Sequence, residues 1–126
     1  MIYLKTVQKT NPNDREAPAK YYVTAPGQGD VDLDKIAARI SEKCTLTEPD
    51  VHAVLHALTI EMTDLLSEGK IIRMGTFGSF QLGVKSHGVD TEEEISRHQV
   101  KAVNVRFRPG RRIKNALSSL RFSVAE

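Results

Sequence analysis

The chain has 126 residues, 40% of them hydrophobic but only 6% aromatic, and carries a formal net charge of +2. This length favours one domain, or one domain with a terminal appendage, with a core so small that oligomerisation would add stability. The lone Cys44 excludes an intrachain disulfide, and no apolar run is long enough to span a membrane. The N-terminus resembles a strand rather than a signal peptide, so we expect a cytoplasmic protein.

The N-terminal segment has the pattern of a β-hairpin. Ile2 to Gln8 alternates with a period of two, a turn signal follows at Asn11 to Asp14, and Lys20 to Thr24 is rich in β-forming residues. Residues 25–29 are typical of a linker. We therefore assign residues 1–30 to a short β appendage and its linker.

Two helices are predicted next. Asp32 is a plausible N-cap for a helix over residues 33–41, and Thr47 for a second helix that runs to about Ser67 and stops at Gly69. The second helix has a wide apolar face and a second, small-residue face. The wide face comprises Val51, Val54, Leu55, Leu58, Met62, Leu65 and Leu66, and the small-residue face comprises Ala53, Ala57 and Ile60. Two apolar faces on one helix indicate burial on both sides, as at a subunit interface.

After Gly69 the pattern changes to strand, glycine turn and strand, over Lys70 to Met74 and Ser79 to Lys85. Ser86 to Gln99 is polar and acidic and is expected to be an extended, mobile connection. A third strand over Val100 to Phe107 then meets a Pro-Gly breaker. A short helix follows the breaker, and Leu120 to Val124 is compatible with a final strand.

Charge is unevenly distributed along this second half. Seven basic residues and one acid lie between Val100 and Glu126, whereas an acidic cluster precedes them at Asp90, Glu92, Glu93 and Glu94. Arg108, Arg111, Arg112 and Lys114 flank the start of the last helix, where backbone N–H groups and the helix dipole attract anions. This segment is compatible with a phosphate-binding site, and equally with a solvated basic turn.

Catalytic and metal-binding patterns are weak. His52 and His56 have a spacing that can hold a metal, but Ala53 stands where a metalloprotease would have Glu, so a solvated polar stripe is favoured. Cys44 is interpreted as a buried structural thiol rather than a nucleophile. The acidic cluster lacks the alternating ligand pattern of a calcium loop. We therefore expect neither an enzyme nor a cofactor or metal site.

Two motifs lie at a specific spacing in the second half of the chain. Gly69 to Phe80 resembles a strand that enters a Gly-Phe-Gly-Asn-Phe-like turn, and Phe107 to Arg111 resembles a Phe-Lys/Arg-Pro-Gly-Lys element. Both motifs, at this spacing, resemble those of the HU and integration-host-factor family of bacterial DNA-binding proteins. The resemblance covers about Val31 to Leu120 and is closest to an extended HU-related subgroup. We take 31–120 as an HU-like DNA-binding domain and 121–126 as a C-terminal tail with a possible strand.

The resemblance implies an α+β fold in which an intertwined homodimer has a helical body, a β-saddle and two protruding β-arms. It also implies non-sequence-specific, architectural binding of double-stranded DNA in the bacterial nucleoid, with no small-molecule substrate. Arg108 and Arg111 match the family's basic residues beside the Pro-Gly turn. The complete set of expected DNA-binding residues is Lys70, Arg73, Lys85, Arg97, Lys101, Arg106, Arg108, Arg111, Arg112 and Lys114.

The arm departs from the family pattern. Ser86 to Gln99 contains no proline and no Arg-Asn-Pro motif, so a proline wedge between base pairs is not expected. Its carboxylates would repel phosphates, and Val89 and Ile95 are the only large apolar candidates for a wedge. The acidic arm and low net charge favour an alternative, a structural or protein-interaction module that has lost strong DNA binding. The basic segment from Arg106 to Lys114 favours DNA binding through phosphate contacts and DNA shape.

Overall fold

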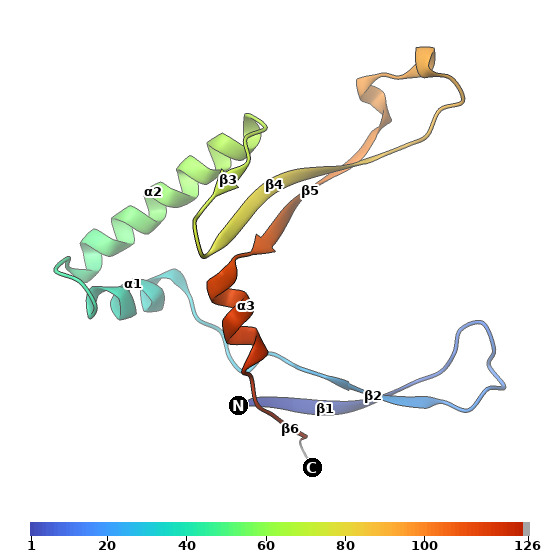
Figure 1. The fold of residues 1–126 in the computed structure, drawn as a ribbon, viewed down its shortest axis with the longest axis horizontal. Coiled ribbons are helices and arrows are strands. Elements are labelled where there is room, and N and C mark those ends of the chain that lie inside the picture. The colour runs from blue at the N-terminus through green and yellow to red at the C-terminus, as the bar shows by residue number, and fades with distance from the viewer. Residues whose placement is uncertain (125–126) are drawn as a thin grey trace. The chain divides into compact units, whose positions relative to one another are not determined.

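The computed structural model describes residues 1–124, which adopt a mixed α+β fold with three α-helices and two small sheets (Figure 1). Contacts group the chain into two compact units. Residues 1–31 form the first unit together with the described residues from Ala116 on, and residues 32–115 form the second.

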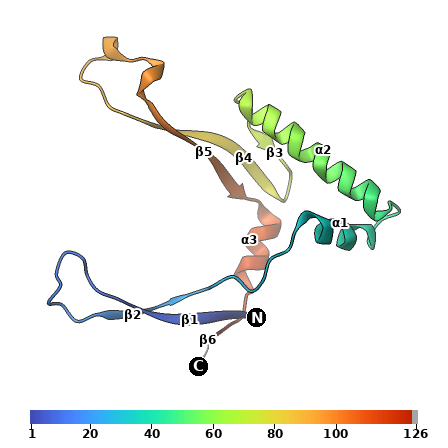
Figure 2. The same ribbon diagram turned by 180° about the vertical axis from the view of Figure 1, so that it is seen from behind.

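The first unit is a three-stranded sheet of order β2-β1-β6, which confirms the strands expected at both ends of the chain. β1 (Ile2–Lys9) pairs antiparallel with β2 (Lys20–Thr24) and parallel with β6 (Phe122–Val124). Figure 2 shows β1 and β2 as a hairpin with an open loop at its far end. Of the predicted C-terminal tail, residues 125 and 126 lie outside the described part of the chain.

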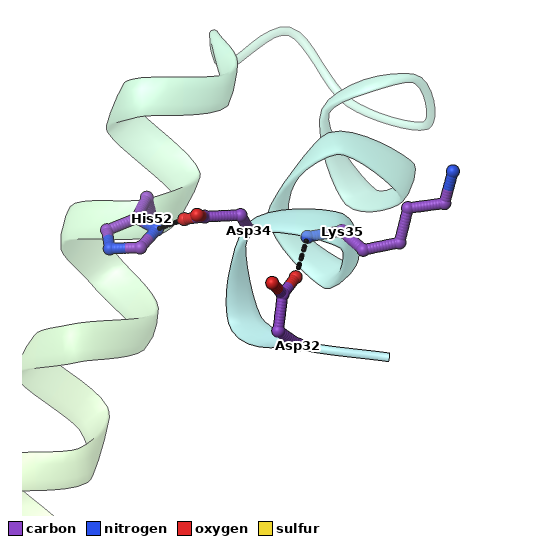
Figure 3. Close-up of polar contacts among 4 residues, drawn as sticks. All are labelled: Asp32, Asp34, Lys35 and His52. Carbon is purple, nitrogen blue, oxygen red and sulfur yellow. Dashed lines mark hydrogen bonds and ion pairs between the residues drawn. The ribbon is translucent and has the colours of Figure 1, made fainter. Parts of the chain in front are cut away.

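The second unit begins with two capped helices, α1 (Leu33–Ser41) and α2 (Glu48–Ser67). Both predicted N-caps are confirmed, because the backbone N–H of Lys35 donates to Asp32 Oδ1 at 2.9 Å and that of Asp50 to Thr47 Oγ1 at 3.3 Å. A polar contact between His52 Nδ1 and Asp34 Oδ1, 3.0 Å apart, joins the two helices (Figure 3).

The apolar core of the single chain is very small. Among the described residues, the only buried hydrophobic side chains are Ala37 on α1 and Val51 on α2. The apolar surface of α2 is otherwise largely uncovered, since Val54 is 58% exposed and Ile60 49%. The prediction that Cys44 is buried is wrong: the thiol lies in the turn between α1 and α2 and is exposed, as side chains in surface connections generally are.

The second sheet has the order β3-β4-β5 with antiparallel pairing throughout. Its strands are β3 (Ile72–Arg73), β4 (Gly78–Ser86) and β5 (Val100–Pro109). β3 is shorter than the predicted Lys70 to Met74. The N–H of Lys70 still donates to the Leu65 carbonyl at the end of α2, and the N–H of Met74 donates to Gly78 across the glycine turn. α3 (Arg111–Ser118) follows the Pro-Gly break as predicted.

The segment between β4 and β5 is folded rather than extended, which corrects the sequence-based expectation. It contains two 3-10 turns, η1 (Glu92–Glu94) and η2 (Arg97–Gln99), the second closed by a capping box between Ser96 and Gln99. The N–H of His87 donates to the Gln99 carbonyl at 2.8 Å, and Gln99 Nε2 donates back to the His87 carbonyl at 2.9 Å. Figure 1 shows this loop at the end of the long β4–β5 ribbon. We refer to residues 87–99 as the hairpin loop.

No helix in the described residues is long and apolar enough to cross a membrane.

Candidate nucleic-acid interface

The register of the second sheet gathers its cations on one face. Ser79 pairs with both Arg73 and Arg108, Gln81 pairs with Arg106, and Lys85 pairs with Ala102. Because side chains alternate along a strand, the residues of these rows project to the same side. We call this side the basic face; it consists of Arg73, Ser79, Gln81, Gly83, Lys85, Ala102, Asn104, Arg106 and Arg108. None of the three strands contains an acidic residue.

The opposite face of the same sheet is apolar. Ile72, Phe80 and Phe107 form one row across the three strands, and Leu82 pairs with Val105 and Val84 with Val103. Phe77 in the turn completes an aromatic cluster, with ring centroids 5.5 Å from Phe107 and 6.1 Å from Phe80. This cluster fixes which side of the sheet is apolar, and therefore which side presents the cations.

Two glycines allow the glycine turn and the Pro-Gly break to approach each other closely beside the basic face. A Cβ on Gly110 would lie 2.3 Å from the Thr76 carbonyl oxygen, and one on Gly78, where φ is +142°, would lie 2.4 Å from the Arg108 carbonyl oxygen. Such distances are too short for any side chain, so glycine is required at both positions. The N–H of Gly110 donates to the Phe77 carbonyl at 2.9 Å, which ties the Pro-Gly break to the glycine turn.

The tied turns enclose a shallow hollow of about 460 Å³ with three cations on its rim, Arg73, Arg108 and Lys114. Its remaining lining is Gly75, Gly78, Ser79, Pro109 and Gly110. The hollow therefore combines cations from β3, β5 and α3 with a glycine-rich surface that a bulky anion can approach. Converging, exposed cations of this kind bind phosphate oxygens well.

The start of α3 does not offer all the free N–H groups that the sequence suggested. The N–H of Arg112 donates to the Thr76 carbonyl at 3.2 Å, and the N–H of Gly110 is held by Phe77. These two donors are already satisfied and are unavailable to an anion. Attraction of phosphate at this turn therefore depends on side-chain cations and not on the helix terminus alone.

All the cations predicted for the interface are exposed, but they occupy different places. Arg106 lies across Gly83 on the basic face, since its Nε would be 2.5 Å from a Cβ there. Lys101 is the extra residue of a bulge where Lys85 pairs with Ala102 and Ser86 with Val100. Lys70 follows α2, Arg97 lies in η2, and Arg111 and Arg112 are in the first turn of α3.

Sequence reasoning missed the polar residues between the cations. Ser79, Gln81 and Asn104 share the basic face and can donate hydrogen bonds to phosphate oxygens. The period-two alternation of the two long strands was the signal that could have identified them, once the pairing of Phe80 with Phe107 was known. Among the described residues, no group of three or more His, Cys, Asp or Glu side chains could hold a metal ion.

We predict that Gly110→Ala destabilises the turn and weakens any ligand binding at the hollow. The new Cβ would press against the Thr76 carbonyl and the Gly78 amide, which are backbone atoms and cannot swing away. Thermal unfolding should begin at a lower temperature than in the native chain. Gly88→Ala is the matched control, since a Cβ there meets nothing within 4 Å. Equal melting curves for Gly110→Ala and the native chain would contradict the proposed steric role.

A search of the solved structures found a similar fold in a crystal structure at 2.25 Å resolution from Bacteroides vulgatus ATCC 8482, described as a candidate bacterial DNA-binding protein. The TM-score is 0.65 at 13% sequence identity, and the match covers 98% of the present chain. It covers only 47% of the other chain, so the present chain spans less than half of that protein. At this identity the likeness establishes the fold alone. Among curated proteins, none matches this chain.

A family model for an HU domain fused to a winged helix-turn-helix, Ig or glycine-rich motif matches residues 1–123. The match includes the first sheet up to Ser123, both capped helices, the basic face and the Pro-Gly break. It confirms the resemblance drawn from the glycine turn and the Pro-Gly element. The chain therefore belongs to this family of HU domains fused to further motifs.

Proposed function

We propose that this chain binds double-stranded DNA without reading base sequence, as an architectural protein of the bacterial nucleoid. The observation that carries the proposal is the acid-free basic face, which continues into the hollow at the Pro-Gly turn. Membership of an HU family supports DNA as the partner. The bacterial DNA-binding description of the structurally similar protein agrees with it.

The chemistry favours phosphate contacts. Arg side chains present several N–H donors in a planar fork that matches phosphate oxygens. Cations spread over a sheet face neutralise backbone charge and release counterions, which supplies affinity without base readout. In this proposal 31–120 is the DNA-binding domain, and Lys70, Arg97, Lys101, Arg111 and Arg112 extend the contact beyond the basic face and its hollow.

The functional unit is proposed to be a homodimer. One chain leaves the apolar side of the second sheet uncovered, with Phe107 41%, Val105 56% and Val103 58% exposed. α2 adds Val54, Leu58 and Ile60 to the uncovered apolar surface. Covering these groups with the same groups of a second copy removes apolar area from water on both partners. The β4–β5 ribbons would then act as a pair of arms along the DNA.

Duplex binding should fall steeply with salt. For each phosphate that the protein neutralises, the logarithm of affinity should fall against the logarithm of salt concentration with a slope of about −0.9. Replacing Arg73 and Arg108 together by Gln should weaken binding to all duplex sequences alike and flatten this slope. Fluorescence anisotropy with labelled duplexes of unrelated sequence measures both quantities.

The matched control for that pair is Lys35→Gln with Lys43→Gln, which removes the same charge from exposed positions outside the second sheet. This control should retain the native slope. Duplex affinity that is independent of salt, or that falls equally in the control, would contradict the proposed interface.

Light scattering after size exclusion should give twice the chain mass of 14.0 kDa. Val54→Asp should shift the protein towards monomer, because it places a carboxylate on the uncovered apolar surface of α2. His56→Asp introduces the same group on the polar stripe of the same helix and should leave the dimer intact. A native chain that is folded and monomeric at micromolar concentration would exclude the proposed assembly.

The acidic hairpin loop should oppose DNA binding. Neutralising Asp90, Glu92, Glu93 and Glu94 to Asn and Gln should raise duplex affinity at low salt. The gain should shrink at high salt, since exposed charges are screened over about 8–10 Å under ordinary ionic conditions. Anisotropy measures the affinity, and energy transfer between the ends of a short duplex measures bending, which should be weaker than a wedge would produce.

A control for the loop variant removes four exposed acids elsewhere, by Asp30→Asn with Glu42→Gln, Glu61→Gln and Glu68→Gln. This control should raise affinity less, because none of its four positions lies in the hairpin loop. If the loop variant instead binds DNA more weakly than the native chain, the acidic loop contributes attraction and its proposed role is wrong.

A further inference from the structure

The first sheet also separates its residues by chemistry. The β1–β2 register pairs Lys9 with Lys20, Val7 with Tyr22 and Lys5 with Thr24. Directly paired residues share a face, and side chains alternate along each strand. One face therefore carries Tyr3, Lys5, Val7, Lys9, Lys20, Tyr22 and Thr24, and we call it the lysine face. No acidic residue lies on it.

The opposite face of this sheet is largely apolar, with Ile2, Leu4, Val23, Phe122 and Val124 on it. A half-buried sheet needs only one apolar face to pack against the rest of a protein. Packing against a core would use the apolar face, so it does not explain why tyrosines lie on the lysine face. They are solvent-accessible, with Tyr3 51% and Tyr22 48% exposed.

The two paired lysines are costly for the hairpin itself. Like charges directly opposite each other on neighbouring strands destabilise the pairing. Lys9 and Lys20 nevertheless face each other at the end of the β1–β2 pair, where a hollow of about 290 Å³ opens. Tyr22, Asn11, Pro12 and Pro18 contribute to its lining. Lys9 Nζ lies 5.8 Å from the centroid of the Tyr22 ring, so a cation and an aromatic ring lie side by side at this hollow.

We infer that the lysine face is a binding surface for single-stranded nucleic acid. A phosphate at the hollow would relieve the repulsion between Lys9 and Lys20, and Lys5 offers a second phosphate contact further along β1. Bases would stack on the accessible tyrosine rings, as on other sheet surfaces that combine cations with aromatic residues. A duplex hides the faces of its bases, so it would make no use of the tyrosines. This inference concerns a unit that the proposed duplex interface does not use.

The chain carries an intrinsic probe for the test. It has no tryptophan and three tyrosines, Tyr3, Tyr21 and Tyr22, all of them in β1 or β2. Tyrosine emission from the 126-residue chain therefore reports on β1 and β2 alone. Titration with an oligothymidine strand of about 15 nucleotides, a length in the range that such surfaces bind, should quench it saturably. Anisotropy of the labelled strand gives the affinity.

Tyr22→Leu should weaken strand binding at least about five-fold, the lower end of the effect of removing one stacked base. Tyr22→Phe should retain binding because it keeps the ring. Tyr21→Leu is the matched control: Tyr21 is the sequence neighbour on the opposite face, 69% exposed. Replacing Lys9 and Lys20 together by Gln should weaken binding and reduce the salt slope by about 0.7 for each phosphate that the variant no longer neutralises.

The roles of the two surfaces can be distinguished by measuring both duplex and single-strand affinity for each pair of substitutions. Lys9→Gln with Lys20→Gln should leave duplex affinity unchanged, and Arg73→Gln with Arg108→Gln should leave strand affinity unchanged. The inference is overturned if Tyr21→Leu and Tyr22→Leu have equal effects. It is also overturned if the arginine pair alone abolishes strand binding, or if the lysine pair weakens duplex but not strand binding. Circular dichroism of each variant checks that the sheet is intact.

Discussion

The register of β4 against β5 is the constraint on which the second sheet depends. Pairing Phe80 with Phe107 sends every apolar side chain of the two strands larger than alanine to one side and every cation outside the bulge to the other. A slip of one residue would exchange the faces. The phenylalanine cluster and the hydrogen bond from Gly110 to Phe77 oppose such a slip, because both join the strand ends to the glycine turn. The basic face therefore exists because an apolar face is fixed behind it.

The small core gives the same apolar face a second role. With only Ala37 and Val51 buried among the described hydrophobic side chains, one chain has little apolar burial to offset the entropy of folding. Of the phenylalanines that set the register, Phe77 and Phe107 remain exposed on a single copy. If the proposed dimer forms, folding and formation of the basic face become one event, since the partner would cover the apolar side of the strands that carry the cations.

Local signals in the sequence predicted most of the elements but not how they combine. Caps at Asp32 and Thr47, the Pro-Gly break and the period-two strands are decided by neighbouring residues, and all were found at or near their predicted positions. The hairpin loop was mispredicted because its polar composition was taken to indicate an extended connection. Ser96 and Gln99 instead form a capping box that closes a short turn. The exposed Cys44 and the occupied N–H groups at the start of α3 depend on tertiary contacts, which no local pattern encodes.

Both sheets separate apolar and cationic side chains onto opposite faces, but the residues on their cationic faces differ. Each has an apolar face and a cationic face, but the basic face uses arginines among Ser, Gln and Asn, whereas the lysine face uses lysines among tyrosines. Arginine forks and small polar groups suit a continuous phosphate backbone, and accessible aromatic rings suit bases that are not paired. If both surfaces act as proposed, one chain has separate surfaces for a duplex and for an unpaired strand, the two forms of DNA that meet where a duplex is partly opened.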